Sequence, residues 1–211
     1  MMDRKESNNI QVDSEVYFKK YDHFRRWVSY WYQIQEVLKL QPKKFLEVGV
    51  GNKTVSTYLQ NRGLDVTTVD IDPELNPDVV CDVRELSKQF KEDSFDVVLC
   101  AEVLEHLPFK DFEKALAEIK KVTRKNVVLT LPNARIPFGV FIKIPKKVIS
   151  FSLSIPLTIK HKFNGEHYWE INKKGYSKKK VRKKIEGLFN IKREYKIPEN
   201  SYHRVFILEK R

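Results

Sequence analysis

Two glycines and two carboxylates of this sequence stand at spacings that suit the binding of an adenosine-containing ligand. Glu47, Gly49 and Gly51 lie where one apolar run ends in a turn, and Asp70 ends the next run. In a parallel sheet both strand ends lie at the same edge, where glycines let the backbone approach a ligand. An acid at the end of the second strand accepts hydrogen bonds from ribose hydroxyls. The pattern therefore predicts a nucleoside-bearing cofactor at this edge.

Two residues of the turn decide between cofactors. The separation of Gly51 and Asp70 is 19 residues, which also fits an NAD site, where about 20 is usual. However, Thr54 stands where the third glycine of an NAD fingerprint would be, and Glu47 would repel a pyrophosphate. A ligand with an ammonium and a sulfonium would instead be attracted, which favours S-adenosylmethionine. A turn without any ligand is disfavoured, because glycine weakens strands and helices unless its freedom is needed.

The elements that must hold these residues follow from the apolar pattern. Nearly continuous apolar runs bounded by polar residues predict buried parallel strands. Helical spacing predicts a helix around 17–38 whose aromatic stripe, including Trp31, packs on the sheet. It also predicts a helix over 111–122 with Asp111 as N-cap, and another that Ser177 caps. The predicted strands are 43–48, 66–70, 77–82, 95–100, 126–131, 191–197 and 205–209. This alternation predicts an α/β protein with a doubly wound sheet.

A further motif lies after the fourth predicted strand. Phe-Asp-Val-Val at 95–98 is followed by Glu-x-x-x-His-Leu at 102–107. Together with the Glu-x-Gly-x-Gly turn, it resembles the class I S-adenosylmethionine-dependent methyltransferases of type 11. The resemblance covers about 43–132 well and the last 35 or so residues more loosely. It implies a Rossmann-like three-layer sandwich around a seven-stranded sheet whose last strand, 205–209, is antiparallel.

The same resemblance implies a cofactor role for several residues. Glu47, Gly49 and Gly51 would hold the methionine part, and Asp70 the ribose. Asp82 would face the adenine amino group beside Val83, and Cys100, Ala101 and Glu102 would line the sulfonium side. Thr54 and Ile71 complete the implied site. The run from Asn52 to Thr54 departs from the family pattern, in which a further glycine or small residue is common.

Length and composition predict one domain. A chain of 211 residues with 41% hydrophobic residues can bury one sizeable core. We expect a disordered segment at 1–12 and a single methyltransferase domain at 13–211. The two cysteines, Cys81 and Cys100, are expected as core residues in a reducing compartment, so the cytoplasm is predicted. No secretory signal, membrane-spanning run or zinc-like spacing is present in the sequence, and no metal site is expected.

The positive charge is concentrated in one block. Residues 135–184 hold 14 basic and 2 acidic residues, a net charge of +12 that equals that of the whole chain. Loops after the strands build the substrate site in this fold. We therefore predict a substrate-lid insertion at 134–176, and prolines 137, 145 and 156 exclude one long helix there.

Three residues are candidates for the chemistry at the acceptor. His167 and Glu166 lie in a stretch that is rich in aromatic and ionisable residues, and His106 ends the motif after the fourth strand. His167 and Glu166 are predicted to position or deprotonate the acceptor, and His106 to wall the site. The alternatives are that His167 simply packs the lid onto the core and that His106 caps a turn.

Several functions remain open at this point. The first is methylation of a small acceptor, which the basic block suggests is anionic. The second is methylation of RNA through a basic face at 160–184. The third is action on a lipid or isoprenoid by a peripheral membrane enzyme. A scaffold domain that only retains the cofactor pocket is a non-enzymatic alternative. The sequence has neither the Asn/Asp-Pro-Pro-aromatic motif nor the cysteine placement of common base methyltransferases.

Overall fold

Seven strands form one mixed sheet at the centre of the molecule. The computed structural model describes residues 10–21, 23–145 and 147–211, with the backbone only at 137–141, 143 and 147–154. The sheet order is β3-β2-β1-β4-β5-β9-β8. The strands are β1 (Lys44–Val48), β2 (Asp65–Asp70), β3 (Val79–Val80), β4 (Phe95–Ala101), β5 (Thr123–Pro132), β8 (Phe189–Lys196) and β9 (His203–Lys210). Strands β1 to β5 are parallel, and β9 is antiparallel to both β5 and β8. The predicted doubly wound sheet with its antiparallel last strand is confirmed.

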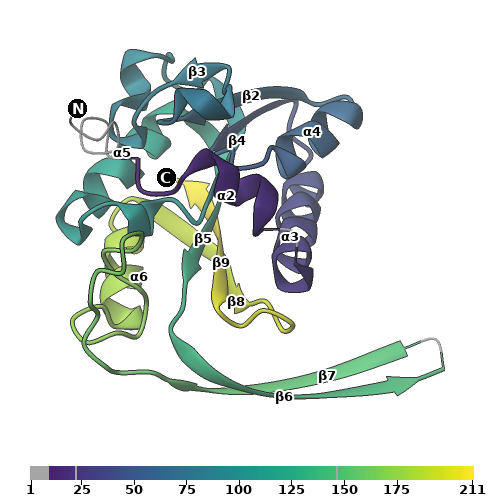
Figure 1. The fold of residues 1–211 in the computed structure, drawn as a ribbon. Coiled ribbons are helices and arrows are strands. Elements are labelled where there is room, and N and C mark those ends of the chain that lie inside the picture. Colours follow the sequence, from purple (N-terminus) through teal and green to yellow (C-terminus); the bar gives the residue numbers. More distant parts are fainter. Residues whose placement is uncertain (1–9, 22, 146) are drawn as a thin grey trace.

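Helices cover both faces of this sheet and make a three-layer sandwich. Helices α3 (Phe24–Leu40) and α4 (Thr54–Asn61) lie on one side, and α5 (Phe112–Val122) and α6 (Lys178–Glu186) on the other (Figure 1). Strand β4 shows how the layers arise. Its Val97 and Leu99 pack into the core under α3 and α4, whereas Val98 and Cys100 pack into the core under α5. Alternate side chains of a strand point to opposite faces, so one apolar run supplies both cores.

Short helices connect these elements. The 3-10 helices are η1 (Pro73–Leu75), η2 (Val83–Lys88), η3 (Leu104–His106) and η4 (Phe109–Asp111). The third strand is shorter than predicted and ends at Val80. Asp82 instead caps η2 and accepts a hydrogen bond from the backbone N–H of Arg84 at 2.8 Å. Asp111 occupies the N-cap position of α5, as predicted, but its side chain makes no capping hydrogen bond. Its carboxylate instead accepts a hydrogen bond from Arg84 at 3.1 Å. Ser177 does cap α6, as predicted.

The N-terminal aromatic segment differs from the prediction. It forms two helices, α2 (Ser14–Lys19) and α3, because His23 caps the start of α3. Trp31 is 56% exposed, so the aromatic stripe does not face the sheet as expected. Buried positions of α3 include Glu36, whose carboxylate accepts a hydrogen bond from the hydroxyl of Tyr195 at 3.0 Å. Hydrogen-bonded polar residues therefore occupy part of the packed face.

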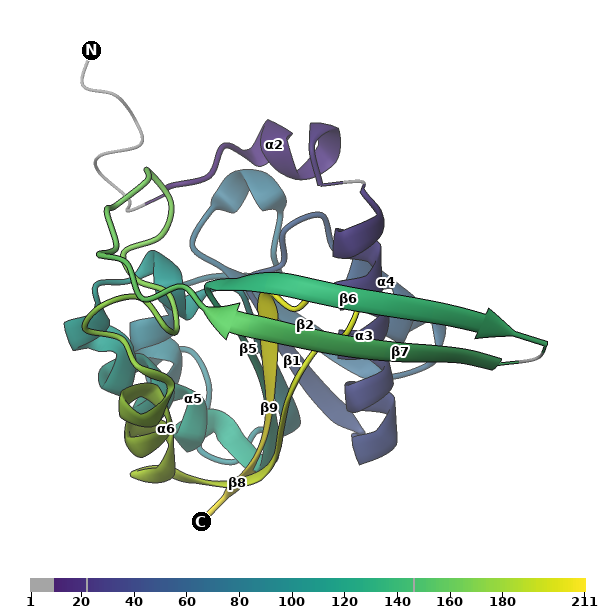
Figure 2. The same cartoon turned by 90° about the horizontal axis from the view of Figure 1, so that it is seen from below.

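The segment predicted as a lid begins with a separate hairpin. Strands β6 (Arg135–Ile144) and β7 (Lys147–Pro156) pair only with each other, as an antiparallel two-stranded sheet. Figures 1 and 2 show the hairpin extending along the outside of the molecule and past it. At its base the backbone N–H of Leu157 donates to the carbonyl of Ala134 at 3.1 Å. Its function as a lid remains a prediction.

The chain after the hairpin returns to the sheet. Trp169 is fully buried, and its indole N–H donates to the carbonyl of Leu107 at 3.1 Å. The backbone N–H of Tyr168 donates to the carbonyl of Glu105 at 2.9 Å. These contacts fix residues 164–172 over the carboxyl ends of the strands. Trp169 thus belongs to the core.

The N-terminal segment also reaches this edge. Of the predicted disordered segment 1–12, residues 1–9 lie outside the described residues, whereas Val12 is described and only 7% exposed. The amide of Gln11 donates to the carbonyl of His106 at 2.8 Å. Within the described part of the chain, no helix is long and apolar enough to cross a membrane.

Candidate active site

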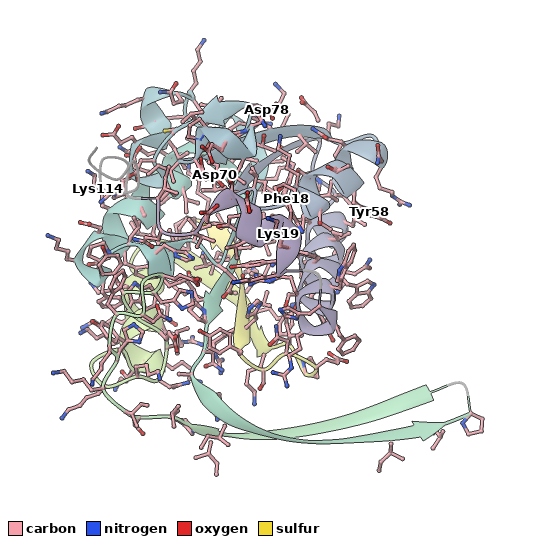
Figure 3. The ribbon with its side chains drawn as sticks, viewed as in Figure 1. Phe18, Lys19, Tyr58, Asp70, Asp78 and Lys114 are labelled. Carbon is pink, nitrogen blue, oxygen red and sulfur yellow. The ribbon has the colours of Figure 1, made fainter. Side chains whose placement is uncertain are left out.

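A cavity of about 390 Å³ lies at the carboxyl ends of β1, β2 and β4. It is enclosed by the N-terminal segment on one side and by residues 164–167 and 202–203 on the other. Figure 3 shows Asp70 beside helix α2, which contributes Tyr17 to the same cavity. The predicted residues that line it are Glu47, Gly49, Gly51, Thr54, Asp70, Ile71, Ala101, Glu102, His106, Glu166 and His167. The structure thus brings together most of the predicted cofactor residues and all three acceptor candidates.

The two glycines of the turn after β1 lie close to neighbouring side chains. Gly49 has φ +82°, and a Cβ at this position would lie 2.3 Å from Cγ2 of Val103. Gly51 has φ +50°, and its Cβ would lie 3.3 Å from the ring of Tyr17. Both glycines therefore serve a turn that is closely approached by neighbouring residues.

Asp70 holds this turn as well as facing the cavity. One carboxylate oxygen accepts a hydrogen bond from the backbone N–H of Val50 at 2.8 Å, and the other accepts one from Asp72 at 3.0 Å. Burial raises the pKa of Asp70, and the hydrogen bonds from Asp72 and Val50 oppose the rise. An ionised carboxylate has about four acceptor sites, so these backbone contacts do not use all of them. Asp70 can therefore accept hydrogen bonds from two ribose hydroxyls without losing its contact with the turn.

Glu47 is a buried acid with one unpartnered oxygen. It is 5% exposed, and its Oε2 has no hydrogen-bond partner among the described residues. Burial raises the pKa of Glu47 to about 8, against the opposing effect of Ser56. A buried carboxylate is costly unless a cation or hydrogen-bond donors satisfy it. The ammonium group of an amino-acid ligand would provide both, so the residues present fit the methionine part of S-adenosylmethionine.

A smaller cavity of about 80 Å³ adjoins the first and shares Gly49, Asp70 and Ile71 with it. Asp82 and Val83 line this second cavity, on the side predicted for adenine. The carboxylate of Asp82 is also held by Arg84, whose Nη2 lies 2.5 Å from Oδ2. Burial would raise the pKa of Asp82, but the hydrogen bonds and charge of Arg84 lower it overall. If Asp82 contacts an adenine amino group, its carboxylate would bind that group and Arg84 at the same time.

Cys100 is the predicted cofactor residue that lines neither of these two cavities. It is fully buried in the core, where it lies opposite Val48 in the pairing of β1 with β4. Its side chain points to the α5 side of the sheet because of the alternation along β4. Burial raises the pKa of its thiol well above the usual range. Cys100 thus has the environment of a structural residue.

His167 is held from one side by a carboxylate and a phenol. Its Nδ1 lies 3.3 Å from Oε1 of Glu170 and 3.4 Å from the hydroxyl of Tyr202. The Tyr202 hydroxyl itself donates to Glu170 at 2.9 Å. Burial would raise the pKa of Glu170, but the hydrogen bonds from His167 and Tyr202 lower it. The ring of His167 is therefore oriented by an ionised carboxylate.

His106 lies across from His167, with ring centroids 5.0 Å apart and planes at 82°. Its Nδ1 lies 3.1 Å from the carbonyl of Glu166 and 3.1 Å from the side-chain oxygen of Gln11. Burial lowers the pKa of His106 to about 4, and the neighbouring His167 lowers it further. His106 is therefore a neutral imidazole near pH 7.

A second histidine–carboxylate pair was not predicted from the sequence. Nε2 of His203 lies 3.5 Å from Oε2 of Glu102, and both residues line the main cavity. Nδ1 of His203 and Oε1 of Glu102 have no hydrogen-bond partner within the described chain. Burial lowers the pKa of His203, although Glu102 opposes this. Because β9 is antiparallel, its first residue lies at the same edge as the carboxyl ends of the parallel strands. The predicted antiparallel last strand could therefore have indicated that His203 lies at the site.

A comparison with protein families identifies the central part of the chain. Residues 46–131 match the type 11 family model that is described as a methyltransferase domain. The matched residues are thus similar to a methyltransferase domain. They include the glycine turn, Asp70, the Asp82 corner and the Glu102–His106 motif, and they end at β5.

Curated relatives resemble the same part of the chain. The ubiquinone biosynthesis O-methyltransferase of Pseudomonas aeruginosa (strain UCBPP-PA14) is 34% identical over 88 residues, which covers 36% of this chain and 38% of the relative. The protein of the same name from Hahella chejuensis (strain KCTC 2396) is 27% identical over 150 residues, covering 65% of this chain and 59% of the relative. The chain therefore matches only part of the length of these relatives.

Solved structures with the methyltransferase fold resemble nearly the whole chain. The 1,6-didemethyltoxoflavin-N1-methyltransferase of Burkholderia thailandensis, with S-adenosylhomocysteine bound, has a TM-score of 0.60 and 18% identity over 88% of this chain and 77% of that one. The PH0226 protein of Pyrococcus horikoshii has a TM-score of 0.61 and 16% identity, over 93% of this chain and 96% of that one. At such low identity, these structures support the fold alone.

Proposed function

We propose that this protein is an S-adenosylmethionine-dependent methyltransferase that methylates a hydroxyl group of a small molecule. The observation that carries the proposal is the unpartnered Oε2 of Glu47, which lies with the Gly49 turn and Asp70 in one cavity. That cavity also contains imidazoles where an acceptor would enter. An oxygen acceptor is supported by the O-methyltransferase relatives, as far as their names go.

The cofactor residues divide the cavity into a binding part and a reacting part. S-adenosylmethionine, when bound, supplies a methyl group activated by the sulfonium. Glu47 would bind its ammonium group, Asp70 the ribose hydroxyls, and the Asp82–Val83 corner would adjoin the adenine. Such residues contribute mainly by alignment and by exclusion of water, because the methyl carbon is already activated.

The reacting part must orient a hydroxyl and remove its proton. We assign the base to His203, because Glu102 faces its Nε2 at 3.5 Å and leaves Nδ1 without a partner among the described residues. A histidine that is oriented by a carboxylate is a common general base. The lowered pKa of His203 keeps its imidazole neutral and able to accept a proton. His167 is assigned to position the acceptor from the opposite side.

The charge of the cavity favours a neutral acceptor over an anionic one. Besides Glu47, its described lining includes four acidic residues, namely Asp70, Asp72, Glu102 and Glu166. Arg26 is the one Lys or Arg side chain in that lining. The positive charge of residues 178–184 lies on α6, which contributes no described residue to either cavity. The basic block therefore gives no support for an anionic small molecule in this pocket, and a phenol or alcohol is favoured.

A lipid or isoprenoid acceptor at a membrane surface is the second candidate. Isoleucines are exposed along the hairpin and after it, namely Ile136, Ile142, Ile144, Ile155 and Ile159. Exposed apolar side chains beside basic residues favour contact with anionic lipid. Cosedimentation with phosphatidylglycerol vesicles, but not with phosphatidylcholine vesicles, would support this candidate. Equal recovery in both supernatants would exclude it.

The proposal is tested first by calorimetric titration with S-adenosylhomocysteine and, in parallel, with NAD. We expect micromolar binding of the former and none of the latter. Asp70→Asn should weaken binding at least about tenfold, because it removes a charged acceptor for two hydroxyl donors. A panel of phenols, alcohols, RNA and isoprenoid phenols would then be screened for methyl transfer. Absence of cofactor binding would contradict the proposal and favour the scaffold alternative.

A further inference from the structure

Three potential metal ligands meet beside the main cavity. Glu105 and His106 belong to η3, and His167 comes from the segment after the hairpin, so they are brought together by the fold. One ligand atom from each lies within 4.8 Å of the others. We name these residues the Glu–His–His cluster. His106 and His167 line the cavity, whereas Glu105 lies behind them.

Glu105 gives independent reason to expect a ligand there. It is fully buried, and neither of its carboxylate oxygens has a hydrogen-bond partner within the described chain. Arg26, which acts on Glu105 through its charge, lies over the ring of Tyr21 at 4.2 Å and donates no hydrogen bond to Glu105. A buried carboxyl group with two unsatisfied oxygens is unusual in a folded protein. A cation bound at this point would satisfy both.

The neighbours of the two histidines suit a metal site. Nδ1 of His167 faces the Glu170 carboxylate at 3.3 Å, so its Nε2 is left toward Glu105, 3.9 Å from Oε1. His106 is held from one side by the carbonyl of Glu166 and by Gln11. A carboxylate or carbonyl that fixes the far nitrogen of a ligating histidine is a regular feature of metal sites. His167 is thus oriented with Nε2 toward Glu105, and His106 offers a ring nitrogen within 4.8 Å of the other ligand atoms.

We propose that Glu105, His106 and His167 bind a divalent transition-metal ion. Two imidazoles and one carboxylate suit Zn²⁺, Mn²⁺ or Fe²⁺, whereas Mg²⁺ and Ca²⁺ prefer ligand sets made of oxygen. Ligand atoms at about 2.1 Å from one ion lie about 3 to 3.5 Å apart. Binding would therefore draw the three side chains inward by roughly an ångström, and three protein ligands would leave a position open toward the cavity.

The role of this ion rests on the proposed function. The hydroxyl oxygen of the acceptor would take the open position, and its coordination would lower the pKa of the hydroxyl. The hydroxyl proton would pass to Nδ1 of His203. The oxygen would then form its bond to the methyl carbon as the carbon–sulfur bond breaks, with the electron pair going to sulfur. His167 would thus position the acceptor through the ion.

The test measures metal binding by the full chain, without any assay of activity. Protein stripped with EDTA and dialysed would be titrated with ZnCl₂, MnCl₂ and MgCl₂ by calorimetry, and its metal content measured by plasma mass spectrometry. We expect one Zn²⁺ or Mn²⁺ per chain and much weaker binding of Mg²⁺. Glu105→Gln and His167→Ala should weaken binding at least about tenfold, and Glu170→Gln by about tenfold. His23→Asn, which keeps a cap at α3, is the control and should bind the metal as the unaltered protein does.

Titration of the same samples with S-adenosylhomocysteine separates the two proposals. Unchanged affinity in Glu105→Gln would show that this variant is folded. Cofactor binding without metal binding, or metal binding that survives both Glu105→Gln and His167→Ala, would overturn the metal site and leave the proposed function standing. Metal binding without cofactor binding would support the site and contradict the methyltransferase proposal.

Discussion

Binding of a ligand ammonium beside Glu47 should release a proton from this carboxyl group. Without ligand the pKa of Glu47 is raised to about 8 by burial, so at pH 7 only about one molecule in eleven carries the charge. An ammonium favours the ionised form, and its binding must first remove the proton. At pH 7 this costs about 1.4 kcal/mol, which is the free energy of one pH unit.

Two measurable quantities follow from this coupling. Binding of S-adenosylhomocysteine at pH 7 should release about 0.9 proton per chain. Its affinity should rise about tenfold for each pH unit from pH 6 to 7 and then level off as the pH passes 8. The sign is fixed because the ligand prefers the deprotonated carboxylate, which becomes more abundant as the pH rises through its pKa.

Titration calorimetry in two buffers tests both quantities. The heat measured in Tris and in phosphate differs by the number of protons released, because the two buffers have different ionisation enthalpies. Glu47→Gln should abolish the proton release and the pH dependence, and it should weaken binding most at pH 8. Glu92→Gln, at an exposed position outside the cavity, is the control. Equal heats in both buffers, with an affinity independent of pH between 6 and 8, would refute the role assigned to Glu47.

Four further predictions concern the fold and the acceptor side. Gly49→Ala should lower the free energy of unfolding by about 1 to 3 kcal/mol more than Gly63→Ala. Both glycines have a positive φ, but only a Cβ at position 49 would meet a neighbouring residue. Equal losses of stability in urea unfolding would contradict this. Asp96→Asn should cost about 2 kcal/mol at pH 7, because the carboxylate accepts hydrogen bonds from two backbone N–H groups and a pairing arginine. Those hydrogen bonds lower the pKa of Asp96, so the stability difference between the two proteins should vanish as the pH falls through that pKa. Urea unfolding at a series of acidic pH values measures this difference, and a difference that persists at low pH would contradict the prediction. Tyr202→Phe should reduce kcat about fivefold with unchanged cofactor affinity, and a changed affinity with intact kcat would argue against an acceptor role. Replacement of 135–156 by a short Gly-Ser linker should leave the fold and cofactor affinity intact, as read by circular dichroism and calorimetry, and an unfolded product would show that the hairpin is structural.

The sheet could be predicted from the sequence because its strands are short apolar runs that local reading detects. The run at β4 is an example, since it is buried on both faces and bounded by polar residues. The prediction that the aromatic stripe of α3 packs on the sheet was wrong. Which face of a helix is buried depends on distant partners such as Tyr195, whose hydrogen bond to Glu36 makes a polar position suitable for the core. Such partners cannot be read from the helix alone.

The grouping of the proposed cofactor residues in one cavity could be predicted for a similar reason. Its residues lie in local motifs at strand ends, so sequence order places them together. The acceptor side combines residues that are far apart, as His203 and Glu102 illustrate, and these meet only because β9 is antiparallel. Glu105 could be read as a surface acid of a turn, and its burial follows from the docking of the segment around Tyr168. Cys100 lies next to the site in the sequence, but its side chain points into the core.

The place of β9 inside the sheet also sets an order of events during synthesis. This strand pairs on both sides, with β5 and with β8, yet it is synthesised after both of them. The nascent chain therefore presents the free edge of β5 until residues 203–210 emerge, and an unpaired edge is open to association with other chains. The turn that would hold the nucleoside, including Asp70, is complete 133 residues before His203 is made. On the proposed function, a nascent chain that lacks His203 would contain the residues that bind the cofactor but not the base for methyl transfer.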